Sequence, residues 1–117
     1  MKSTALILTQ SPFANSSNHD ALDMAMVLGT FEIPTALFFV SGAVSQFMTL
    51  NPEVLGIKNY VKSFAALPFY DVEDLYVCRE DFQSHNMSTE NLPDDFQLLN
   101  KQEIREKLQC YHQVIKF

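Results

Sequence analysis

The run Thr4-Ala5-Leu6-Ile7-Leu8-Thr9 decides the fold class, because it is almost continuously apolar over the length of one strand. Such runs are typical of strands that are buried on both faces of a parallel sheet. A second run of this kind, Thr35-Ala36-Leu37-Phe38-Phe39-Val40, follows Pro34. Between the two runs, apolar residues recur at helical spacing over 19–29. This order of strand, helix and strand indicates a βαβ unit.

The rest of the chain continues the same alternation, without a Gly/Ser/Pro-rich linker or an internal repeat. Gly29 lies where a left-handed residue is expected to end the first helix. Asn100 is a predicted helix N-cap, and Glu103 completes a capping-box pair with it. The other expected elements are a turn over 41–44, a short helical piece over 44–50, a helix over 57–65 that Pro68 ends, strands over 74–78, 96–99 and 113–117, and helices over 79–82 and 101–110.

These elements predict a single domain over residues 1–117. Its fold class is α/β, with three α/β/α layers around an open, mainly parallel five-stranded sheet. In such sheets, functional sites gather where loops leave the carboxyl ends of the strands. The loops that qualify are 10–18, 41–50 and 78–82.

Composition excludes several classes of function. The formal net charge is -6 and the pI is about 4.8, so the basic surface that nucleic-acid binders carry is not expected. The apolar run of Ala5–Leu8 is too short for a signal peptide or a membrane span, and we expect neither. Cys78 and Cys110 form no C-x-x-C motif, which favours a reducing, cytoplasmic setting.

Cofactor and metal sites are not expected either. The loop after the first strand has no glycine, so it cannot form a dinucleotide-binding or P-loop fingerprint. Its Ser and Asn residues leave a flavodoxin-like flavin site as a weaker alternative. His19, His85 and His112 share no metal-ligand spacing, and each is expected in a solvated or capping role.

Cys78 is the strongest candidate for a chemically reactive side chain. It is expected at the carboxyl end of the strand over 74–78 and just before a helix, where unpaired N–H groups favour a thiolate. Arg79 would add to that effect, whereas Glu80 and Asp81 would oppose it. Cys78 is therefore a candidate for sulfur chemistry, with a small buried apolar residue as the alternative. For Cys110 only the structural role is expected.

Four stretches at consistent spacing carry a family pattern. They are S-P-F-A-N-S-S-N-H-D-A-L-D at 11–23, A-L-F-F-V at 36–40, L-P-F-Y-D-V-E-D-L-Y-V-C at 67–78 and V-I-K-F at 114–117. Together they span nearly the whole chain, and they resemble the TusC/DsrF-like branch of the DsrE family. The sequence departs from the family at Ala14 and Asn18, where glycine is common, and at Gly42–Val44, where the family usually has D-G-V.

The resemblance implies a subunit of a sulfur-relay complex, a dimer of heterotrimers with TusB-like and TusD-like partners. In that relay, persulfide sulfur passes through TusA, the D-type subunit and TusE to the enzyme that 2-thiolates the wobble uridine of tRNA. The family handles sulfur chiefly at a cysteine of the D-type subunit, whose position corresponds to Cys78 here. The resemblance thus implies a mainly structural subunit in which Cys78 is a candidate persulfide site.

Two further expectations follow from the resemblance. The DsrF relatives belong to sulfur-oxidation machinery, which remains an alternative to tRNA thiolation. The ten Phe residues are expected to be covered in part by sister subunits, so the isolated chain should behave poorly in solution. Candidate contact residues are Phe47, Phe69 and Tyr70.

Overall fold

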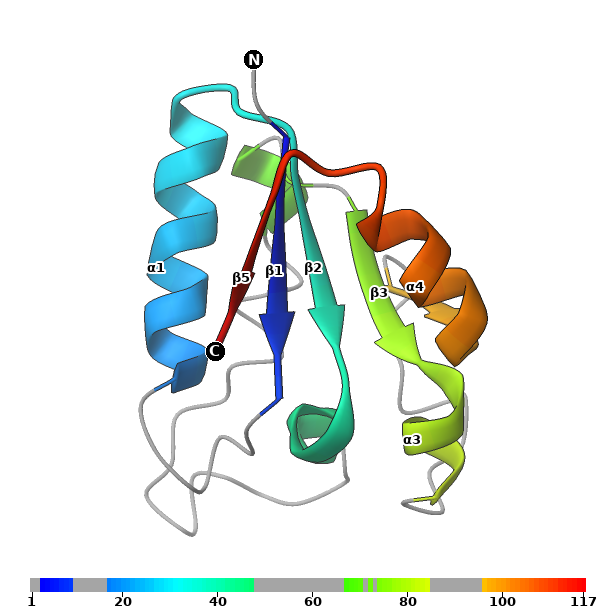
Figure 1. The fold of residues 1–117 in the computed structure, drawn as a ribbon. Helices are drawn as coiled ribbons and strands as arrows, with labels where there is room; N and C mark the ends of the chain where they lie inside the picture. The colour runs from blue at the N-terminus through cyan, green and yellow to red at the C-terminus, as the bar shows by residue number, and fades with distance from the viewer. Residues whose placement is uncertain (1–2, 10–16, 48–66, 71, 73, 85–95) are drawn as a thin grey trace, which may run out of the picture.

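The structure is a computed structural model that describes residues 3–9, 17–47, 67–70, 72, 74–84 and 96–117. Strands and helices alternate along these residues, as the apolar runs predict (Figure 1). The helix expected over 57–65 and the loop residues 10–16 lie outside the described residues. The strands are β1 (Thr4–Leu8), β2 (Thr35–Phe39), β3 (Asp74–Cys78), β4 (Phe96–Leu99) and β5 (Gln113–Lys116), the helices are α1 (Ser17–Thr30), α3 (Arg79–Ser84) and α4 (Lys101–Leu108), and two 3₁₀ helices are η1 (Ser41–Phe47) and η2 (Leu67–Tyr70).

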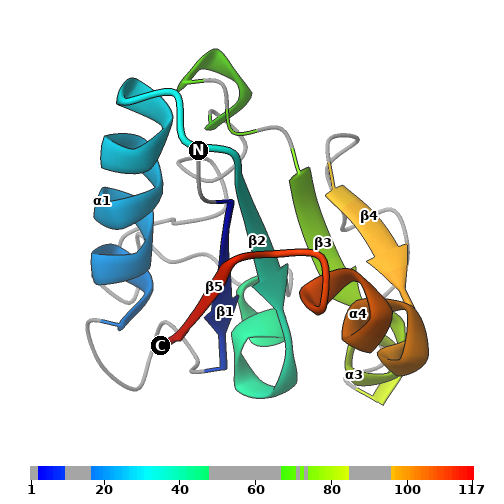
Figure 2. The same ribbon diagram turned by 45° about the horizontal axis from the view of Figure 1, so that its top comes forward.

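The five strands form one sheet in the order β4-β3-β2-β1-β5, and all four pairings are parallel. Figure 2 shows β4 and β5 at the two edges, with β1, β2 and β3 between them. The registers align apolar residues across the sheet, so that Leu6 lies opposite both Leu37 and Ile115. The expected three-layer α/β architecture is confirmed, and the sheet is entirely rather than mainly parallel.

Two apolar cores lie on opposite faces of the sheet, because alternate residues of each strand point to opposite sides. Helix α1 covers one face, where Leu6, Leu37 and Phe39 are fully buried. Helix α4 covers the other face, through Ile104 and Leu108. Aromatic rings fill the second core: the ring centroid of Phe38 lies 5.1 Å from that of Tyr76 and 6.1 Å from that of Tyr111.

Helix α1 ends in a Schellman turn that the sequence did not reveal. The N–H of Ile33 donates to the Leu28 carbonyl and the N–H of Glu32 donates to the Gly29 carbonyl. In this motif the residue with the left-handed backbone is Glu32, at φ 59°. The expectation that Gly29 would take that conformation is wrong, because Gly29 lies inside the helix and buried.

Helix α4 begins as the sequence predicts and ends two residues earlier. The Asn100 side chain accepts from the Glu103 N–H at 2.8 Å, and the Glu103 carboxylate accepts from the Asn100 N–H at 3.0 Å, which forms the expected capping box. The helix stops at Leu108, and 109–112 form a turn into β5.

The exit from β2 also differs from the expected turn followed by a helical piece. Helix η1 begins at once, at Ser41, and runs to Phe47, so the residues expected to turn the chain already lie in a 3₁₀ helix.

Within the described ranges, no helix is long and apolar enough to cross a membrane.

Candidate functional site

Cys78 is the last residue of β3 and directly precedes α3, as the sequence predicts. Its side chain is only 1% exposed and belongs to the core under α4. Two of the loops expected to carry function meet here, because the carboxyl ends of β2 and β3 are neighbours in the sheet. Helix η1 follows β2 and α3 follows β3, and the two helices contact each other.

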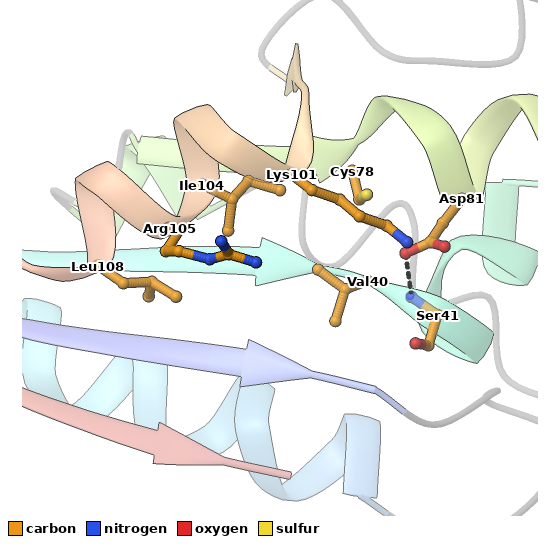
Figure 3. A pocket seen from close by; sticks show the side chains of 8 residues that line it. All are labelled: Val40, Ser41, Cys78, Asp81, Lys101, Ile104, Arg105 and Leu108. Carbon is orange, nitrogen blue, oxygen red and sulfur yellow. Dashed lines mark hydrogen bonds between the residues drawn. The ribbon is translucent and has the colours of Figure 1, made fainter.

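A pocket of about 300 Å³ opens beside Cys78, at the carboxyl ends of β2 and β3. Figure 3 shows that its side chains come from the end of β2, from the β3–α3 junction and from one face of α4. Apolar groups form one part of the wall, and charged groups of both signs form the other. The lining residues are Val40, Ser41, Cys78, Asp81, Lys101, Ile104, Arg105 and Leu108.

Asp81 fastens the β2 exit to α3. Its Oδ2 accepts a hydrogen bond from the Ser41 N–H at 2.7 Å, which is the dashed line in Figure 3. Ser41 has φ 50°, a left-handed backbone that is uncommon for a residue other than glycine. A short bond from an N–H to a carboxylate is among the stronger hydrogen bonds, so it stabilises this unusual conformation.

Glu80 fastens α3 to α4 in the same way. Both oxygens of its carboxylate accept from the Lys101 N–H, at 3.2 Å and 3.1 Å. The carboxylate therefore lies at the first turn of α4, where unpaired N–H groups and the helix dipole favour negative charge. Its Oε1 also lies 4.0 Å from Cys78 Sγ.

The surroundings of Cys78 favour the neutral thiol over the thiolate. Burial raises the pKa of the Cys78 thiol above its ordinary value of 9.0 and is the largest cause. The Asp81 and Glu80 carboxylates raise the pKa further, whereas a hydrogen bond from the Asp81 N–H lowers it. The Arg79 guanidinium donates to the Leu98 carbonyl at 3.4 Å. At neutral pH, Cys78 is therefore a thiol that must lose its proton before it can attack sulfur.

The other candidate residues from the sequence lie away from the pocket or outside the described residues. His112 is exposed at the opposite end of the sheet, where its Nδ1 lies 3.3 Å from the Ser3 N–H. Cys110 is exposed, and its thiol contacts the Glu106 carbonyl. The side chain of His19 and the whole of His85 lie outside the described residues.

Sequence reasoning missed Ser41 and the two cations of the pocket, Lys101 and Arg105. Ser41 appeared only as part of a turn. Lys101 and Arg105 are four residues apart, so they share one face of α4, which is the signal that could have indicated a charged wall. Which strand ends that face would cover could not be deduced, because it depends on the sheet order.

Apolar side chains remain exposed away from this pocket. Phe31 is 70% exposed in the turn after α1, and Val27 is 54% exposed one helical turn earlier. In the edge strand β5, Val114 is 46% exposed. The side chains of the three residues expected to form subunit contacts, Phe47, Phe69 and Tyr70, lie outside the described residues.

The fold is an α/β fold with a pocket at the carboxyl ends of β2 and β3, and the chain belongs to the DsrE/DsrF-like family, whose model matches residues 2–117. Among individual proteins, it is 33% identical over 115 residues to the Protein TusC homolog of Pseudomonas aeruginosa, an alignment that covers 97% of each chain. Two solved structures share the fold over all of both chains. They are the ychN protein of E. coli, with a TM-score of 0.81 and 20% identity, and protein MTH1491 of Methanobacterium thermoautotrophicum, with a TM-score of 0.65 and 11% identity.

Proposed function

We propose that this chain is a non-autonomous subunit of a sulfurtransferase complex that relays persulfide sulfur for 2-thiolation of the tRNA wobble uridine. The observation that carries the proposal is the similarity to a TusC homolog over 97% of the chain, together with membership of the DsrE/DsrF-like family. Both support a subunit of a multi-subunit sulfur relay. The partners in this proposal are TusB-like and TusD-like subunits in a dimer of heterotrimers, with TusA and TusE reached through the complex.

The acidic character of the chain supports a role without direct RNA contact. A net charge of -6 disfavours binding to phosphate groups, and a relay delivers sulfur through protein carriers instead. Among the described residues, the exposed apolar side chains of Val27, Phe31 and Val114 support contact with sister subunits.

Within the complex, we assign the chain a mainly structural role. Burial of the Cys78 thiol raises its pKa, and the carboxylates of Asp81 and Glu80 raise it further. These surroundings suit a small apolar residue that fills space below α4 better than a resting nucleophile. On this proposal the chain packs against its sister subunits and shapes their site.

A second candidate role, sulfur carriage by Cys78 itself, is favoured by the position of this residue in the wall of an open pocket. Sulfur would arrive as the persulfide of a donor cysteine. The Cys78 thiolate would attack the outer sulfur of that persulfide, the sulfur–sulfur bond of the donor would break, and the donor cysteine would leave as a thiolate that takes up a proton. The step needs no external oxidant or reductant.

Sulfur loading of the purified complex separates the two roles. Parent, Cys78→Ser and Cys110→Ser chains are loaded by a cysteine desulfurase and its carriers, and the intact mass of each chain is measured. If Cys78 carries sulfur, the parent and Cys110→Ser chains gain one sulfur atom and Cys78→Ser does not. Equal uptake in all three removes Cys78 from the relay and leaves the structural role.

Co-expression with the neighbouring genes tests the assembly. We expect the chain to elute as a stable heteromer with small related subunits, and Cys78→Ala to elute in the same way. A chain that elutes alone, with every co-expressed partner in other fractions, contradicts the proposal. Partners from sulfur-oxidation machinery would instead favour the DsrF-like alternative.

A further inference from the structure

We propose that the pocket beside Cys78 binds a small carboxylate with a short aliphatic body, held by Arg105 and Lys101 against the apolar wall. The inference concerns the pocket used above, but it does not require that Cys78 carry sulfur. It therefore goes beyond the proposed subunit role, and the two can fail separately.

The shape and wall of the pocket set the size and polarity of this ligand. A volume of about 300 Å³ lies at the lower end of the range for small-molecule sites, roughly 300–1,000 Å³. Val40, Ile104 and Leu108 supply aliphatic groups from β2 and from one face of α4. Figure 3 shows these three side chains and Arg105 around the same space. An aliphatic body fits such a wall because it removes apolar surface from water.

The two cations supply the recognition of an anion. Lys101 and Arg105 are four residues apart on α4 and line the same pocket. Among the described residues, the Arg105 guanidinium takes part in no hydrogen bond or ion pair, so its donors are free to bind a ligand. A guanidinium matches a planar carboxylate with two parallel hydrogen bonds, which a simple ammonium cannot do.

The carboxylates near the pocket limit the ligand to a single negative charge. Asp81 is occupied by the Ser41 N–H, and Glu80 by the N–H at the start of α4. The lining therefore carries two cations against one carboxylate, a formal charge of +1. A monoanion balances this charge, whereas a dianion would leave repulsion from Asp81 uncompensated.

The test titrates the 117-residue chain with 4-methylvalerate as the probe and follows backbone amide shifts by NMR. We expect saturable shifts at Ser41, Cys78 and Arg105, and none with the neutral isostere 4-methylvaleramide. Arg105→Gln should weaken binding about tenfold, because it removes the charge and the paired hydrogen bonds of the guanidinium at a partly exposed site. Lys116→Gln, which removes an exposed cation of β5 outside the pocket, is the matched control and should bind as the parent does.

Several outcomes overturn the inference. They are shifts that do not saturate, equal binding of the amide and the carboxylate, or equal weakening by Arg105→Gln and Lys116→Gln. Inorganic sulfate that binds as tightly as 4-methylvalerate overturns the assignment of an aliphatic monoanion. Probe binding is measured without any sulfur donor, which separates this site from the sulfur-loading experiment. Unfolding temperatures of all variants show that lost binding is not lost folding.

Discussion

The sulfur of Cys78 lies between groups that act on its charge in opposite directions. The carboxylate of Asp81 favours the neutral thiol, while the N–H of the same residue favours the thiolate. The carboxylate is also bound to the Ser41 N–H at 2.7 Å. The Asp81 side chain therefore acts both on the backbone at the β2 exit and on the pKa of the thiol, where it adds to the larger effect of burial.

Replacing Asp81 by Asn tests this dual role. Asn can still accept from the Ser41 N–H, but it has no charge, so we expect the pKa of Cys78 to fall. Because the raised pKa withholds the thiolate until alkaline pH, the variant should react severalfold faster with iodoacetamide at neutral pH, and its pH profile should move to lower pH. The measurement is the alkylation rate at Cys78 by peptide mass spectrometry.

Asp74→Asn is the matched control for this rate. It removes an exposed carboxylate at the start of β3, at the other end of the strand from Cys78, and should leave the profile unchanged. A profile in Asp81→Asn that matches the parent would show that burial alone governs the thiol.

The sequence predicted where Cys78 lies and which neighbouring charges oppose a thiolate. It could not predict the bond between Ser41 and Asp81, whose positions are 40 residues apart. That contact exists only because β2 and β3 pair in parallel with their carboxyl ends together. Which distant segments pair in a sheet cannot be deduced from the local sequence of either segment.

Among the elements, α4 has the start that the local sequence indicates most clearly, through its capping box. Its capping box satisfies two N–H groups at the start of a helix of only 8 residues. Asn100→Ala should lower the free energy of unfolding by about 1 kcal/mol, because one first-turn donor loses its partner. Denaturant unfolding measures the change.

Gln102→Ala, at an exposed position of the same helix, is the comparison for the cap. It should change stability by less than about 0.5 kcal/mol. Equal losses in the two variants would mean that the cap contributes nothing particular to α4.

At the end of α1, by contrast, the glycine in the sequence led to a wrong prediction of the left-handed residue. A glycine stands near the expected end, yet the left-handed position falls on Glu32, at φ 59°. Hydrogen bonds to the carbonyls of Leu28 and Gly29 fix that position, and they depend on how far the helix continues against the sheet. Helix length was set here by packing rather than by the glycine.

Glu32→Gly should therefore stabilise the protein by about 1 kcal/mol, since glycine adopts the left-handed backbone without a steric penalty. Thermal or denaturant unfolding measures the gain. Thr30→Gly, inside the last turn of α1, should destabilise by about 1 kcal/mol instead. A loss of stability in Glu32→Gly would contradict the Schellman turn.

For the whole molecule, the fold class and the strand positions could be predicted from continuous apolar runs separated by helical periodicity. The order β4-β3-β2-β1-β5 could not, because it depends on pairing between segments that are far apart in the sequence. The position of β5 beside β1 brings α4 across the second face of the sheet, and this crossing builds the pocket. The site is thus a product of topology more than of any one motif.

As a subunit of a sulfur relay serving tRNA, the chain should be needed for thiolation in the cell. The most direct measurement is the 2-thiouridine content of tRNA from cells that lack the chain, determined by mass spectrometry of the digested nucleosides. We expect 2-thiouridine to fall sharply when the chain is removed and to return when the parent chain is supplied. An unchanged 2-thiouridine content after removal of the chain would contradict it.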